Sequence, residues 1–114
     1  MKVNGYIAEL RLNGTVKAIY VRMGGFENLE RYHNTQVAVD KLMEYDEFNN
    51  IGNADFIPDN EDIYDENKTC YSDKDKLRQP LIFNFKEDFE DFIEKDVLSS
   101  RAYLWDRRCW QKLK

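Results

Sequence analysis

The stretch VNGYIAELRLNGTVKAIYVR, residues 3–22, decides the fold. Apolar and polar side chains alternate on both sides of Asn13-Gly14, with the two-residue period of a β-strand. An asparagine-glycine pair is a strong hairpin signal, because a type I′ turn needs positive φ at both central residues. We therefore predict that the chain opens with a β-hairpin. The side chains of its first strand that are expected to face the core are Asn4, Tyr6, Ala8, Leu10 and Leu12.

Helical signals follow this hairpin. Met23-Gly24-Gly25-Phe26 breaks the strand period, and adjacent glycines are typical of a tight backbone reversal. A short helical turn is predicted at 28–32, and a longer helix comes next. The parts of that longer helix are a cap at Asn34 or Thr35, an apolar stripe with Val37 and Leu42 that runs to Tyr45, and one further turn with Phe48 and Ile51 before Gly52.

The segment at 53–68 differs from its surroundings, because six acidic residues crowd into it around a single proline. We interpret it as a long acidic loop, a kind of segment that is either functional or mobile. Regular structure returns after it. The predicted elements are a short strand at 69–72, an extended stretch at 80–83, a helix at 85–95 that Asn84 and Glu87 cap, and a final hairpin at 101–113.

This order of elements predicts one α+β domain over residues 1–114. Hairpins at both ends favour a mainly antiparallel sheet built from them, and we expect the two helices to pack on one face of that sheet. Hydrophobic residues make up 42% and aromatic residues 14% of the chain, which is enough apolar material for one core.

The composition also limits the classes of partner that we expect the protein to bind. The 22 acidic and 17 basic residues leave a net charge of −5, which argues against general nucleic-acid binding, because such binders gain affinity from basic patches. No continuous apolar run of the signal-peptide or membrane-span type occurs, so we expect no membrane contact and a cytoplasmic location. The sequence leaves the oligomeric state open.

No catalytic or metal-binding constellation is recognisable in the sequence. His33, the only histidine, is expected to cap a helix at the surface, and Cys70 and Cys109 are expected to be buried free thiols in strands. The acidic segment lacks the glycine and closing glutamate of a calcium loop, and Gly24-Gly25 lacks the lysine of a phosphate loop. We therefore predict no enzyme activity, no cofactor and no metal.

Many short segments, taken in order, resemble a family of small uncharacterised proteins found mostly in bacteriophages and mobile elements. These segments are Asn13–Tyr20, Met23–Phe26, Leu29–Tyr32, Asn34-Thr35, Ile51-Gly52, Tyr71–Asp75, Phe89–Phe92 and Tyr103–Asp106 with Trp110. The family pattern has a histidine-tryptophan-aspartate-glycine segment where this chain has Arg22–Gly25, so a site formed there in relatives would be altered. The family has no established activity. The resemblance therefore implies a phage origin and a fold, and no mechanism.

Two classes of function remain, with an enzyme as a distant third. The first is a protein-binding module that acts on a host protein through exposed aromatic anchors. The second is an acidic decoy that imitates DNA and blocks a host nuclease or defence factor, which requires a continuous acidic face formed by 46–66 and 87–96. The candidate binding surface comprises Met23, Gly24, Gly25, Phe26, Asp59, Glu61, Asp62, Tyr64, Asp65 and Trp105.

Overall fold

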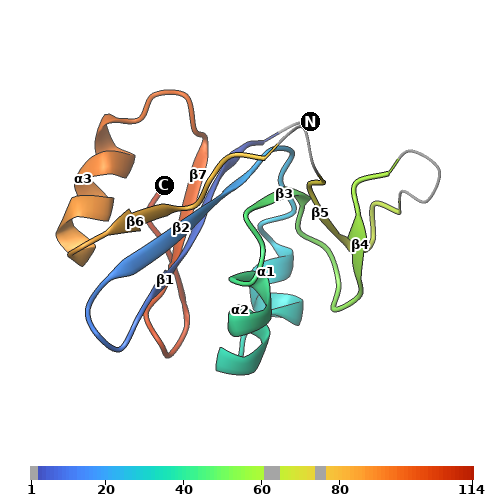
Figure 1. Ribbon diagram of the computed structural model, residues 1–114, viewed down its shortest axis with the longest axis horizontal. Coiled ribbons are helices and arrows are strands. Elements are labelled where there is room, and N and C mark those ends of the chain that lie inside the picture. The colour runs from blue at the N-terminus through green and yellow to red at the C-terminus, as the bar shows by residue number, and fades with distance from the viewer. Residues whose placement is uncertain (1–2, 61–64, 74–76) are drawn as a thin grey trace.

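The computed structural model describes residues 3–60, 65–73 and 77–114. In these residues the protein is α+β, with one mixed sheet of eight strands and three helices (Figure 1). The strands are β1 (Gly5–Leu10), β2 (Val16–Val21), β3 (Glu47–Asn50), β4 (Phe56–Pro58), β5 (Thr69–Tyr71), β6 (Leu81–Phe83), β7 (Arg101–Trp105) and β8 (Trp110–Lys112). The helices are α1 (Asn28–Tyr32), α2 (Gln36–Leu42) and α3 (Lys86–Lys95).

The opening hairpin is confirmed, but its turn differs from the predicted one. Strands β1 and β2 pair antiparallel, with Tyr6 opposite Tyr20. Gly14 has φ +87°, whereas Asn13 does not have positive φ, and the Gly14 N–H donates to the Arg11 carbonyl at 2.9 Å. This is a three-residue loop in which only the last residue is left-handed, so the type I′ prediction is wrong.

Strands from the two ends of the chain are neighbours in the sheet. Strand β7 lies parallel to β1, and β8 closes the predicted C-terminal hairpin beside β7. The other edge of β2 is shared between antiparallel β6 and parallel β3, and β5 and β4 continue outward from β3. Four of these seven pairings are antiparallel and three are parallel, so the sheet is mostly but not purely antiparallel.

The helices cover opposite faces of the sheet, so the expectation that they share one face is not confirmed. Leu29 of α1 and Leu42 of α2 belong to one buried cluster with Ile7, whereas Phe89 of α3 belongs to another with Ala8. Successive side chains of a strand point to opposite faces, which is why neighbours in β1 join different clusters. Both faces of β1 are therefore buried, and its odd-numbered residues are as much core as the even-numbered ones.

Helix α2 is shorter than predicted. Thr35 is its N-cap, and the Thr35 side chain accepts a hydrogen bond from the Ala38 N–H at 3.2 Å, as expected. The helix ends at Leu42, and the predicted further turn is instead strand β3, in which Phe48 pairs with Val21. Pairing with β2 and burial of Phe48 override the helical spacing of the sequence.

The predicted acidic loop contains a strand. Strand β4 pairs in parallel with β5, so part of 53–68 belongs to the sheet, while residues 61–64 lie outside the described residues. The last predicted helix is confirmed as α3, but Phe85 is its N-cap and not Asn84. In the ranges that the structure describes, no helix has the length and apolar composition that a membrane span requires.

Candidate functional site

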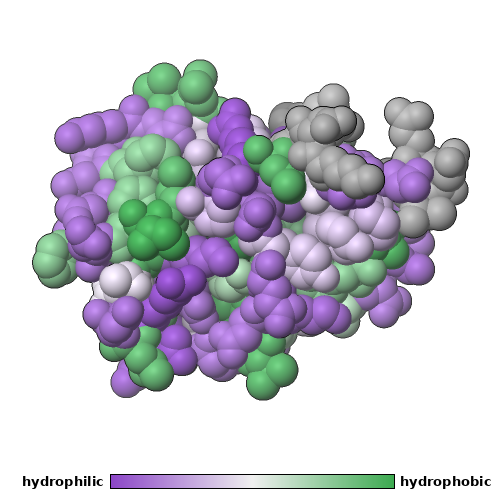
Figure 2. All heavy atoms as spheres, viewed as in Figure 1, coloured by the Kyte–Doolittle hydropathy of each residue, from purple (hydrophilic) through white to green (hydrophobic). Residues whose placement is uncertain are grey.

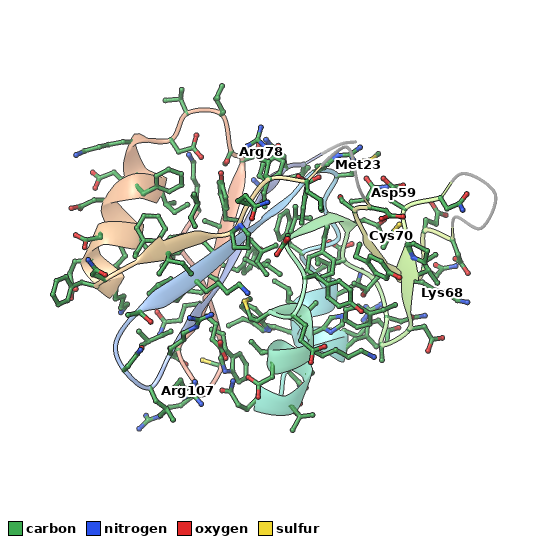
Figure 3. All side chains as sticks on the ribbon, in the orientation of Figure 1. Met23, Asp59, Lys68, Cys70, Arg78 and Arg107 are labelled. Carbon is green, nitrogen blue, oxygen red and sulfur yellow. The ribbon has the colours of Figure 1, made fainter. Side chains whose placement is uncertain are left out.

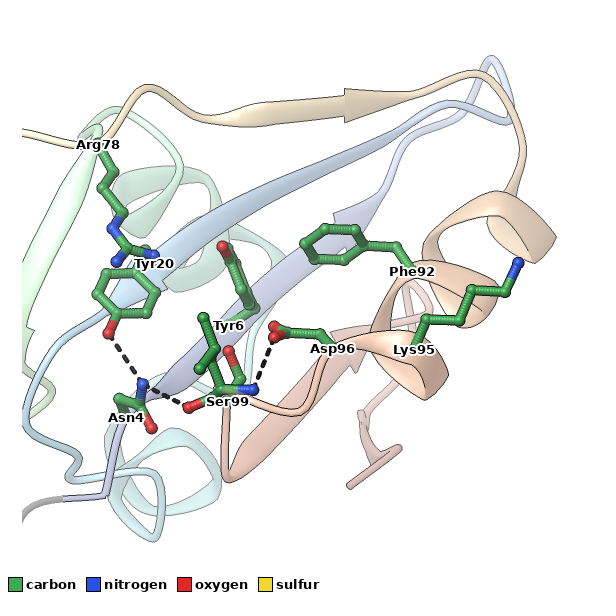
Figure 4. A pocket seen from close by; sticks show the side chains of 9 residues that line it. Asn4, Tyr6, Tyr20, Arg78, Phe92, Lys95, Asp96 and Ser99 are labelled. Carbon is green, nitrogen blue, oxygen red and sulfur yellow. Dashed lines mark hydrogen bonds between the residues drawn. The ribbon is translucent and has the colours of Figure 1, made fainter.

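A pocket of about 400 Å³ opens on the α3 face, beside the last turn of that helix (Figure 4). Strands β1 and β2 form its floor, α3 and the following loop form one side, and the segment before β6 forms the other. Its lining residues are Asn4, Tyr6, Tyr20, Arg78, Phe92, Lys95, Asp96, Leu98 and Ser99.

Three aromatic rings make the walls of this pocket. Hairpin register places Tyr6 opposite Tyr20, and their ring centroids are 5.4 Å apart in an edge-to-face arrangement. Phe92 of α3 meets Tyr6 edge-to-face at 5.5 Å. Rings held by two strands and a helix provide a stiff apolar surface, which suits recognition.

Polar groups fix the ends of the pocket. The Asn4 Nδ2 group donates to the Tyr20 hydroxyl at 2.9 Å and to the Leu98 carbonyl at 3.0 Å, and so ties the loop after α3 to β1. The Arg78 guanidinium lies 3.9 Å from the centre of the Tyr20 ring, which is a cation–π contact. Burial raises the pKa of Tyr6, and the Arg78 side chain beside its hydroxyl acts in the opposite direction.

A carboxylate stands at the other end of the pocket. Burial alone would raise the pKa of Asp96, but hydrogen bonds from Ser99 and the Leu98 N–H, together with the charge of Lys114, outweigh it and lower that pKa. The Leu98 side chain itself is 79% exposed at the rim. The loop therefore presents an apolar side chain to solvent while its backbone is held by Asp96.

The predicted turn residues come together at a different place. Met23, Gly24, Gly25 and Phe26 line a hollow of about 260 Å³. Phe26 is buried and stacks on Tyr103, with centroids 5.4 Å apart, so it is a core residue and not an exposed anchor. The turn shapes the surface, but it lies apart from the aromatic pocket.

Among the other predicted surface residues, Asp59 lies next to that turn, because it pairs with Arg22, the residue that precedes Met23. The two side chains are 3.4 Å apart, and Asp59 lies toward the β4–β5 end of the molecule, where Cys70 also lies (Figure 3). Asp65 accepts a hydrogen bond from the Asn67 N–H, and Glu61, Asp62 and Tyr64 lie outside the described residues. Trp105 is only 2% exposed and donates from Nε1 to Gln36 at 2.7 Å, so its prediction as a surface anchor is wrong.

Two buried titratable residues have structural partners. His33 is 1% exposed, with Nε2 3.0 Å from the Gly52 carbonyl, so the predicted surface position is wrong. Burial lowers the pKa of His33. Glu47 accepts hydrogen bonds from the Ser72 hydroxyl at 2.9 Å and from the Arg78 N–H at 2.6 Å. These contacts join separate segments of the chain.

The two cysteines differ. Cys70 is buried as predicted, and burial raises the pKa of its thiol to about 11, so it is not a reactive thiolate. Cys109 is exposed in the turn before β8, which contradicts the predicted burial. Across residues 3–60, 65–73 and 77–114, no group of three or more histidine, cysteine, aspartate or glutamate residues could hold a metal ion.

Sequence reasoning missed the aromatic pocket. Its one visible signal was the pair Tyr6 and Tyr20, because correct hairpin register sets these rings side by side on one face. Arg78 and Leu98 gave no signal, because tertiary packing brings them to the strands. No protein-family model, no curated protein and no solved structure matches this chain.

Proposed function

We propose that this protein is a non-catalytic binding module that works in the cytoplasm on a host protein. The choice of a host protein follows from the phage origin that the resemblance implies. The contact surface that we propose is the α3 face with its aromatic pocket. The observation that carries this proposal is a pocket of about 400 Å³ with three aromatic walls and an exposed leucine at its rim.

Further apolar side chains are exposed along α3 and β6. Val97 is exposed next to Leu98 at the pocket, whereas Ile82 and Phe85 are exposed toward the other end of α3, where β6 leads into that helix. Figure 2 shows apolar side chains gathered over β6 and beside α3. Apolar side chains around a hollow, rimmed by charged residues, are typical of protein-interaction surfaces, so they support a binding module.

The arrangement of acidic residues speaks against the alternative of a DNA mimic. That alternative needs 46–66 and 87–96 to form one acidic face. Helix α3 and strands β4 and β5 instead lie toward opposite ends of a molecule about 40 Å long (Figure 1). The charge of α3 is therefore separated from that of the β4 region by the central strands.

The test compares two equally exposed side chains. Leu98 is 79% exposed at the pocket and Val37 is 81% exposed on α2, so Leu98→Asp and Val37→Asp make matched variants. A partner identified by affinity purification from the host is then purified and its affinity measured for each. We expect Leu98→Asp to weaken binding at least about tenfold and Val37→Asp to leave it unchanged.

Two results would contradict the proposal. One is equal binding by wild type and Leu98→Asp, which would place the contact elsewhere. The other is an affinity that falls steeply with salt and does not respond to either variant, which would favour the acidic decoy.

A further inference from the structure

We infer that the aromatic pocket binds a peptide segment of the partner in which an acidic side chain lies beside an apolar one. This inference rests on the proposed function and names the chemistry of its ligand. It follows from the hydrogen-bonding groups of the pocket that remain available and from their placement.

Arg78 is the cation that contacts the aromatic rings of the pocket, whereas Lys95 lines the Asp96 end with its ammonium group pointing away from the rings (Figure 4). In residues 3–60, 65–73 and 77–114 no carboxylate forms an ion pair with Arg78. Its guanidinium packs against the Tyr20 ring, 3.9 Å from the centroid (Figure 4). Stacking of this kind occupies the face of the guanidinium and leaves N–H groups at its edge, which match the two oxygens of a carboxylate.

The position of Arg78 is fixed before a ligand arrives. Its backbone N–H donates at 2.6 Å to Glu47, which is 1% exposed and also accepts from Ser72. Its side chain stacks on the ring of Tyr20. Preorganisation lowers the entropy that binding would cost.

The remaining groups give the ligand a direction. The Asp96 carboxylate stands at the far end from Arg78, where the Leu98 N–H and Ser99 bind it (Figure 4). The charge of Lys114 offsets part of the Asp96 charge, so a ligand carboxylate is attracted chiefly at the Arg78 end, where no carboxylate of the described residues pairs with the guanidinium. Phe92 and Leu98 flank the Asp96 end, so the apolar side chain of the ligand lies over them.

A peptide suits this pocket better than a free carboxylate. Asn4 donates from Nδ2 to Tyr20 and Leu98, while its Oδ1 has no hydrogen-bond partner among the described residues. Asn4 lines the pocket, and its amide oxygen can accept a hydrogen bond from a donor such as a backbone N–H. A segment with a backbone donor, an acidic side chain and an apolar one uses all three features.

The probes are two pentapeptides, acetylated and amidated, with a leucine between two glutamates or between two glutamines and a glycine at each end. Each is titrated into the 15N-labelled full chain while chemical shifts are followed. We expect both to shift Tyr20, Phe92 and Leu98, and the glutamate peptide to bind about threefold more tightly or better. This advantage should shrink at high salt.

Variants of Arg78 then separate charge recognition from folding. Arg78→Gln should remove the preference for glutamate and leave binding of the glutamine peptide unchanged, and Arg78→Lys should restore part of the preference. Arg31→Gln on α1 is the control, because α1 packs on the opposite face, and it should change neither affinity. Spectra of the free variants test whether each is folded.

Failure of this inference is distinguishable from failure of the proposed function. Equal affinities of the two peptides, or an equal effect of Arg78→Gln on both, would overturn the acidic ligand and leave a binding pocket. If neither peptide shifts the pocket resonances but Leu98→Asp still weakens partner binding, the inference is overturned and the proposed function stands. If Leu98→Asp has no effect either, both proposals fall.

Discussion

The two faces of the central sheet differ in how completely they are covered. On the face of α1 and α2, the strands present large side chains such as Ile7, Ile19 and Trp105. On the α3 face the same strands present Ala8 and Ala18, on which Phe89 and Ile93 pack, as they do on Ala102 and Leu104. Small strand residues allow a single helix to lie close to the sheet, but one helix covers only part of that face.

The aromatic pocket lies where α3 stops covering the sheet. Helix α3 has 10 residues, a length of about 15 Å, and it stops at Lys95. Near its end, Tyr6 and Tyr20 stand on the strands in place of alanine, and only Phe92, the Leu98 loop and Arg78 lie at their sides. On the opposite face, Phe26 and Phe48 continue the buried cluster. Incomplete helical cover therefore leaves an aromatic surface available for a ligand.

The largest expected effect tests whether the α1/α2 face carries more of the stability. Trp105→Ala should lower the free energy of unfolding by about 3–5 kcal/mol, because it removes a fully buried indole. Phe92→Ala at the pocket should cost less than about 2 kcal/mol, because Phe92 is half-buried. Urea denaturation measures both, and equal losses would contradict the difference between the faces.

A second test concerns the turn that leads the chain onto the α1/α2 face. Gly25 has φ +91°, and a Cβ there would lie 1.9 Å from the Ile51 carbonyl oxygen, whereas a Cβ on Gly14, at φ +87°, would meet open space. Gly25→Ala should cost about 3 kcal/mol and Gly14→Ala about 1 kcal/mol in the free energy of unfolding. Similar costs would show that backbone strain alone, and not close packing on β3, fixes this turn.

The sequence predicted strands and helices with strong local signals. Both hairpins, the Thr35 cap and helix α3 follow from alternation, capping and helical spacing. The face of each helix did not follow, because β1 is buried on both sides and a pattern of alternating polarity cannot say so. Glu9, for example, is a charged residue in β1 that is nevertheless buried.

The wrong prediction of the turn type at Asn13-Gly14 explains in large part why the aromatic pocket was missed. A two-residue loop at Asn13-Gly14 would pair Tyr6 with Val21, whereas the three-residue loop pairs Tyr6 with Tyr20. A shift of one residue exchanges the faces of a strand, so the aromatic pair is visible only in the correct register. The approach of Arg78 depends on its bond to Glu47, a contact between distant segments that local patterns do not encode.

The smallest expected effect is a dependence on pH that belongs to the α1/α2 face. His33 lies in this cover, with its Nε2 beside Gly52 and Thr69 and its carbonyl accepting from Trp110 Nε1. Burial lowers the pKa of His33, and the charge of Lys41 adds to this. Its contribution to stability is therefore complete above the unfolded pKa of about 6.5 and is lost as the pH falls from there through the lower folded pKa.

Thermal unfolding measured between pH 7.5 and 5.5 tests this, because carboxylates titrate mainly below that range. Wild type should lose stability across the interval, and His33→Gln, which cannot take up a proton, should lose less. The pocket variant Arg78→Gln should follow the wild-type profile, since its change lies on the α3 face. A steeper profile for His33→Gln than for wild type would show that protonation is accommodated there, and that the α1/α2 face is less tightly closed than its packing indicates.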